Sequence, residues 1–184
     1  MRKVGIFIDG ANQYAACKAV GFDIDYGKLK SAVMMAIGED PTRVARVNYY
    51  TAVLEGGDGF VSIAPLLDWL EYHGYTVVTK PAKVFENAGE GPRKVKGNMD
   101  VEMVVDVLTL APKLDVVVLM TGDGDFTALV AELQRQNVWV VVVSTFETSP
   151  SMCADELRRQ ADQFVRLEDL RAAISKPRKV REES

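Results

Sequence analysis

The chain opens on the stretch Val4-Gly5-Ile6-Phe7-Ile8-Asp9-Gly10-Ala11-Asn12, in which an apolar run ends at an acid, a glycine and an asparagine. The run is rich in valine and isoleucine and alternates little, as a strand buried on both faces of a sheet does. We therefore predict a central strand over Arg2 to Ile8. The polar residues after it are expected at the carboxyl end of the strand, where parallel α/β sheets bind their ligands.

Strands alternate with helical patterns along the rest of the chain. Further strands are predicted over residues 43–53, 75–80, 114–120 and 138–144, with a short one at Phe164-Val165. This alternation predicts an α/β fold, a three-layer α/β/α sandwich with a mostly parallel sheet of five or six strands. Residues 82–97 are expected to form a loop or a loose hairpin, and Ser149-Pro150 to begin a helix that runs to about Ala161.

Length and composition indicate a globular protein of one domain. The 184 residues carry a net charge of −4, and 48% of them are apolar. We expect a domain over residues 1–175 and a disordered charged tail over residues 176–184. The chain has no membrane-length apolar stretch or signal-peptide pattern, and Cys17 and Cys153 lack metal-ligand spacing, which favours a cytoplasmic protein with reduced thiols. The acidic balance argues against a non-specific nucleic-acid coat, but not against an enzyme acting on nucleic acid.

Two more acidic clusters lie where helices are predicted to begin. They are Lys96-Gly97-Asn98-Met99-Asp100 and Thr121-Gly122-Asp123-Gly124-Asp125, the latter directly after an apolar run. Each acid alone has a structural interpretation as a helix cap, a first-turn acid or a turn residue. Together at the strand ends of one sheet, however, carboxylates repel one another and usually need a cation between them. The sequence therefore predicts a divalent-metal site and phosphate chemistry, with the Thr121 hydroxyl available to a phosphate or a water.

The other polar residues point to no second chemistry. Asp106 lies roughly 120° around its helix from Asp100, which favours a supporting role, and Glu102 is expected to be solvated. The single histidine, His73, precedes a glycine at a helix end and has no partner for a nucleophilic triad. Dinucleotide-binding and Walker glycine patterns are missing from the sequence.

These motifs together resemble the NYN domain family, a branch of the PIN-like nucleases that includes the LabA-like bacterial proteins. The resemblance runs from Val4 to about Leu167. It is carried by Phe7 to Asn12, Lys96 to Glu102, Thr121 to Phe126 and Asp155 to Asp162. The chain departs from the family pattern at Thr121, where many relatives have serine, and at Asn98-Met99, which lengthens the second motif.

The resemblance implies a PIN-like fold, related to the Rossmann fold, and a metal-dependent endoribonuclease acting on single-stranded RNA. It implies Mg²⁺ or Mn²⁺ as the cofactor. The metal-binding and catalytic residues would be Asp9, Asp100, Asp123 and Asp125, and substrate-binding roles would fall to Asn12, Lys96 and Thr121. Further phosphate contacts are expected from Arg93, Lys94 and Arg158, while Arg159 is expected on a solvated helix face.

Two other functions remain open at this point. The first is a non-catalytic regulatory or RNA-binding module with the same fold, which the acidic balance favours. The second is a phosphatase with Asp9 as its nucleophile, which would be expected to carry a second aspartate at the position of Ala11. Whether the chain forms a homodimer is also left open.

Overall fold

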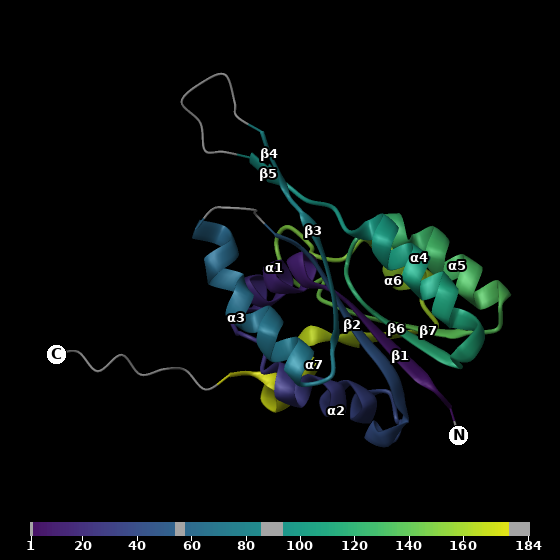
Figure 1. Ribbon diagram of the computed structural model, residues 1–184. Coiled ribbons are helices and arrows are strands. Elements are labelled where there is room, and N and C mark those ends of the chain that lie inside the picture. The colour runs from purple at the N-terminus through teal and green to yellow at the C-terminus, as the bar shows by residue number, and fades with distance from the viewer. Residues whose placement is uncertain (1, 54–57, 86–93, 177–184) are drawn as a thin grey trace.

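A single parallel sheet of six strands forms the centre of the protein (Figure 1). The structure is a computed structural model that describes residues 2–53, 58–85 and 94–176, with the backbone alone for residues 58–62, 83–85 and 94–96. The strands lie in the order β3-β2-β1-β6-β7-β8. Their bounds are β1 Val4–Asp9, β2 Val44–Val53, β3 Thr76–Pro81, β6 Val116–Met120, β7 Trp139–Ser144 and β8 Gln163–Arg166.

Helices cover both faces of this sheet, so the predicted three-layer α/β/α sandwich is confirmed. Figure 1 shows α1, α2, α3 and α7 on one face and α4, α5 and α6 on the other. Their bounds are α1 Gly10–Val20, α2 Tyr26–Ala36, α3 Asp58–Tyr72, α4 Asp100–Leu110, α5 Thr127–Arg135, α6 Asp155–Gln160 and α7 Leu167–Ile174. The described residues also contain three short 3₁₀ turns: η1 Pro41–Arg43, η2 Ala111–Lys113 and η3 Gly124–Phe126.

The central strand, β1, contributes side chains to a hydrophobic cluster on each face of the sheet. Successive side chains of a strand point to opposite faces. Accordingly, Ile6 and Ile8 pack with α1, α2, α3 and α7, whereas Phe7 packs with α4, α5 and α6. Because both faces are covered, the inner strands carry apolar residues at nearly every position, which is why they are recognisable in the sequence.

The order of the strands reverses beside β1. The chain runs outward from β1 to β2 and β3, then returns to place β6 on the other side of β1. Both neighbours pair with β1 in parallel, and Ile8 lies opposite Met120. A crevice outside the carboxyl ends of the strands at such a reversal is the usual ligand site of open α/β sheets.

Two local features refine the sequence predictions. Within residues 82–97, β4 (Lys83–Phe85) and β5 (Lys94–Lys96) pair as a small antiparallel sheet, the hairpin alternative, and residues 86–93 lie outside the described part. The helix predicted to begin at Ser149-Pro150 begins only at Asp155. The Ser151 hydroxyl exchanges hydrogen bonds with the backbone of Cys153, which favours a turn there, and the acids of the first turn suit the later start.

Both cysteines, Cys17 and Cys153, are buried and free. Among the described residues, none of the helices combines the length and apolarity needed to cross a membrane. The expected end of the domain at residue 175 is untested and stays a prediction, and residues 177–184 of the predicted tail lie outside the described part.

Candidate metal centre

Asp9 and Thr121 follow the two strands that meet at the reversal. Asp9 ends β1 and caps α1, where its carboxylate accepts the backbone N–H of Asn12 at 3.1 Å. The Thr121 hydroxyl donates to the other carboxylate oxygen of Asp9 at 3.2 Å and accepts the backbone N–H of Asp123 at 3.2 Å. Thr121 is fully buried, so its side chain holds Asp9 and the following loop in place.

The loop after β6 is fixed to α1 and to the segment before α6. The Asn12 side-chain oxygen accepts the backbone N–H of Gly122 at 2.9 Å. A Cβ atom on Gly122 would lie 1.8 Å from the backbone oxygen of Met152, so only glycine fits at this position. Asn12 therefore ties the first turn of α1 to the loop that carries Asp123 and Asp125.

Three carboxylates converge beside this loop. One oxygen from each of Asp100, Asp123 and Asp125 lies within 4.8 Å of the others. Asp123 accepts the backbone N–H of Asp125 at 3.0 Å, which closes the turn that brings the two acids together. Asp100 is the first residue of α4, and its N–H donates to the Asn98 side chain at 2.7 Å. The chain thus delivers two acids from the loop after β6 and one from the start of α4.

Asp9 lies beside these three carboxylates without belonging to their 4.8 Å group. Burial raises the pKa of Asp9, the hydrogen bonds from Asn12 and Thr121 oppose that rise, and repulsion from Asp100 and Asp123 adds to it. Burial likewise raises the pKa of Asp100, against its hydrogen bond with Asn98, and the charges of Asp123 and Asp125 raise it further. The four predicted ligands therefore share one electrostatic environment, in which added positive charge is favoured.

Asp9, Asp100 and Asp123 line a cleft of about 360 Å³ at the carboxyl edge of the sheet, and Asp125 lies next to it, within the 4.8 Å group. Its walls include Asp9 and Asn12 from the α1 side and Asp100 from the α4 side. Gly97 lets the chain before α4 pass close to β2, since a Cβ there would lie 2.1 Å from that of Ala52. The ligand atoms are carboxylate oxygens, the donors preferred by Mg²⁺, Mn²⁺ and Ca²⁺. The residues present thus fit a hard divalent cation.

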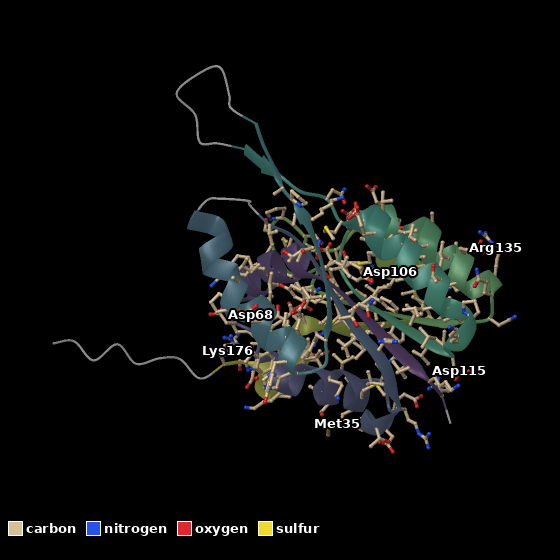
Figure 2. The ribbon with its side chains drawn as sticks, viewed as in Figure 1. Met35, Asp68, Asp106, Asp115, Arg135 and Lys176 are labelled. Carbon is tan, nitrogen blue, oxygen red and sulfur yellow. The ribbon has the colours of Figure 1, made fainter. Side chains whose placement is uncertain are left out.

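The sequence did not place two supporting contacts next to this cleft. Lys80 of β3 binds the Glu102 carboxylate at 2.8 and 3.0 Å, so Glu102, whose side chain is 37% exposed, is solvated as expected but also ion-paired. Tyr50 lines the cleft and donates to Asp106 at 3.0 Å, which agrees with the supporting role expected of Asp106. Figure 2 shows Asp106 on α4, across the sheet from Asp68 on α3.

Most of the predicted phosphate contacts are untested and stay predictions. Lys94 and Lys96 lie in β5, where the structure describes their backbone and not their side chains, and Arg93 lies outside the described residues. Arg158 and Arg159 both bind Asp155, at 2.7 and 2.6 Å. The expected phosphate contact of Arg158 therefore competes with an ion pair inside its own helix.

A parallel sheet with helices on both faces and aspartates at its carboxyl edge defines a PIN-like α/β/α domain. More specifically, the chain belongs to the NYN domain family, whose model matches residues 3–168. It is 32% identical over 178 residues to the Low amplitude and bright protein LabA of Synechococcus elongatus, covering 95% of this chain and 88% of that protein.

A solved structure has the same fold. It is the crystal structure of a protein of unknown function from Vibrio parahaemolyticus, with 26% sequence identity and a TM-score of 0.69. The match covers 92% of this chain and 94% of the other. Membership of the NYN family and the aspartate cluster together indicate nuclease-type chemistry.

Proposed function

We propose that this protein is a metal-dependent ribonuclease that hydrolyses phosphodiester bonds of single-stranded RNA. The observation that carries the proposal is the convergence of Asp100, Asp123 and Asp125, whose oxygens lie within 4.8 Å of one another at the carboxyl edge of the sheet. Three carboxylates this close repel one another unless a cation lies between them. Family membership supports the nuclease chemistry, and the choice of RNA follows the PIN-like resemblance.

Asp100, Asp123 and Asp125 would hold Mg²⁺ or Mn²⁺, and Asp9 would add a fourth negative charge beside them. When bound, such an ion neutralises developing charge on a phosphate and lowers the pKa of a coordinated water. The remaining residues set the geometry: Thr121 and Asn12 hold the ends of β1 and β6 together, and Asn98 orients the start of α4. Lys96 is proposed as a phosphate contact from the neighbouring hairpin.

The proposal is tested with a labelled single-stranded RNA in Mn²⁺, in Mg²⁺ and with a chelator. We expect Asp123→Asn to lower the cleavage rate at least on the order of 100-fold, because it removes a charge from the metal site. The asparagine oxygen still accepts the Asp125 N–H, so the turn should remain folded. The matched control is Asp68→Asn on the exposed face of α3, which should cleave at the wild-type rate. Equal rates for Asp123→Asn and Asp68→Asn would overturn the proposal.

The second candidate function is a non-catalytic RNA-binding or regulatory module. The observation that favours a regulatory role is the engagement of nearby cations with acids of the same chain, Lys80 with Glu102 and Arg158 with Asp155, which leaves these cations less available to phosphates. The net charge of −4 also favours it. RNA binding by the wild type without metal-dependent cleavage, on several RNA sequences, would decide for this module and against the ribonuclease.

A further inference from the structure

A second and larger cavity lies on the other side of α1. It has a volume of about 620 Å³, within the range of roughly 300–1,000 Å³ typical of small-molecule sites. Its walls come from α1, from the start of α2, from β2 and from α3, which lies next to α1 in Figure 1. The residues used below are Tyr14, Cys17, Tyr26, Tyr49 and Leu66.

This cavity borders the acidic cleft. Ala11 and Thr51 line both of them. Gly10, which also lines the larger cavity, directly follows Asp9, which lines the cleft. A polymer with one phosphate at the carboxylates can therefore extend over these shared residues toward the larger cavity.

The lining is aromatic and largely uncharged. The rings of Tyr26 and Tyr49 meet edge to face with centroids 5.6 Å apart. Burial raises the pKa of both hydroxyls, which keeps these side chains neutral. Among the described residues, the two charged lining residues are Asp23, which Lys18 binds at 3.0 Å, and Lys176, which is exposed. Such a lining suits a flat neutral ring better than a phosphate.

At the edge of the cavity one tyrosine is largely exposed. Tyr14 is 62% exposed, and the Lys18 ammonium lies 5.3 Å from the centre of its ring. Aromatic faces next to cations are the platforms on which proteins stack the bases of single-stranded nucleic acids. Tyr14 thus offers a stacking surface between solvent and the Tyr26–Tyr49 pair.

We propose that this cavity, the base pocket, binds a nucleobase of the single-stranded RNA whose phosphate lies at the acidic cleft. The inference rests on the proposed function for the identity of the polymer. It adds a subsite in which Tyr14 stacks on the base and the Tyr26–Tyr49 pair forms the wall behind it. The shared residues Ala11 and Thr51 set the path from the phosphate to the base.

The test is equilibrium binding of a labelled single-stranded RNA, with Ca²⁺ replacing Mg²⁺ and Mn²⁺ and the RNA checked for intactness on a gel. Tyr14→Ala removes the stacking surface, and Leu66→Trp fills the base pocket. Each should weaken binding on the order of tenfold. The matched control is Tyr72→Ala, which removes a tyrosine of α3 that is 88% exposed and outside the pocket, and it should bind as the wild type does.

An RNA with one abasic nucleotide, moved along the strand, provides the complementary test. At the position that occupies the base pocket, the missing base should weaken binding to the wild type and have no further effect on Leu66→Trp. The base pocket is refuted if Tyr14→Ala and Leu66→Trp, shown to be folded by thermal unfolding, bind like Tyr72→Ala. It is also refuted if Leu66→Trp changes the oligomeric state with RNA affinity intact, since the occupant would then be a second copy of the chain.

The ribonuclease and the base pocket can be refuted independently of each other. Weaker binding by the pocket variants without metal-dependent cleavage by the wild type would keep the base pocket and remove the nuclease. Metal-dependent cleavage by the wild type, with unaltered RNA binding by the pocket variants, would keep the nuclease and remove the base pocket. Tyr14 is mostly exposed, so its substitution keeps the test valid even if Leu66→Trp does not fold.

Discussion

The two cavities beside α1 differ in chemistry although one helix borders both. On the acidic side, Asp9 and Asn12 hold their positions through hydrogen bonds to backbone and hydroxyl groups. On the aromatic side, Tyr14 and Cys17 border the base pocket among packed rings. The positions of the polar side chains on the acidic side therefore depend on a few hydrogen bonds, whereas the shape of the aromatic side depends on packing. Substitutions on the two sides should therefore change different properties of the protein.

The largest effect on folding is expected at the tightest backbone contact of the acidic side. In Gly122→Ala the new methyl group would lie 1.8 Å from the backbone oxygen of Met152, and the bond from Gly122 N–H to Asn12 would be displaced. We expect a loss of about 3 kcal/mol in the free energy of unfolding, measured with urea. The matched control, Gly124→Ala, meets mainly the flexible end of Glu156 and should lose about 1 kcal/mol or less. Equal losses would show that the loop is not held by this contact.

A metal ion should stabilise the folded protein by binding to the acidic side. A ligand at a hundredfold excess over its Kd adds about 2.7 kcal/mol to the stability of the folded state. For a chain of this size that corresponds to a rise in the unfolding midpoint of about 5–10 °C. We expect Mn²⁺ to produce this rise in the wild type and in Asp68→Asn. In Asp100→Asn, which removes one carboxylate of the converging group, the rise should largely disappear. A rise unchanged in Asp100→Asn would place the ion elsewhere.

The acidic side is the part that the sequence predicts best. Its residues follow buried strands, and the apolar runs Val4 to Ile8 and Val116 to Met120 are unmistakable because both faces of the sheet are covered. Parallel pairing then brings the ends of these runs together. The fold class and the neighbourhood of the aspartates follow from that pattern alone.

Partners from separate elements are the part that the sequence does not reveal. The Lys80–Glu102 pair joins β3 to α4 across the hairpin, and the link from Tyr50 to Asp106 crosses 56 positions. The base pocket is hidden for a different reason. Tyr26 and Tyr49 are spaced like ordinary core aromatics, and only the packing of α1 against α3 and β2 leaves a cavity beside them.

The smallest effect is expected from the thiol on the aromatic side. Burial raises the pKa of Cys17 to about 12, from an ordinary value of 9.0. The folded state then holds its proton between these two values while the unfolded state loses it. A raised pKa therefore contributes stability that is lost as the pH rises through this window. At pH 10 the loss should be about 1 kcal/mol, and at pH 8 it should be negligible.

The measurement is the free energy of unfolding of the wild type and of Cys17→Ala between pH 8 and pH 10. Cys17→Ala should be less stable at pH 8, because it leaves a gap beside the base pocket, and the difference should narrow by about 1 kcal/mol toward pH 10. Parallel curves would mean that water reaches this thiol in the folded protein. Water would then also enter the base pocket, and a neutral base would gain little by leaving solvent to bind there.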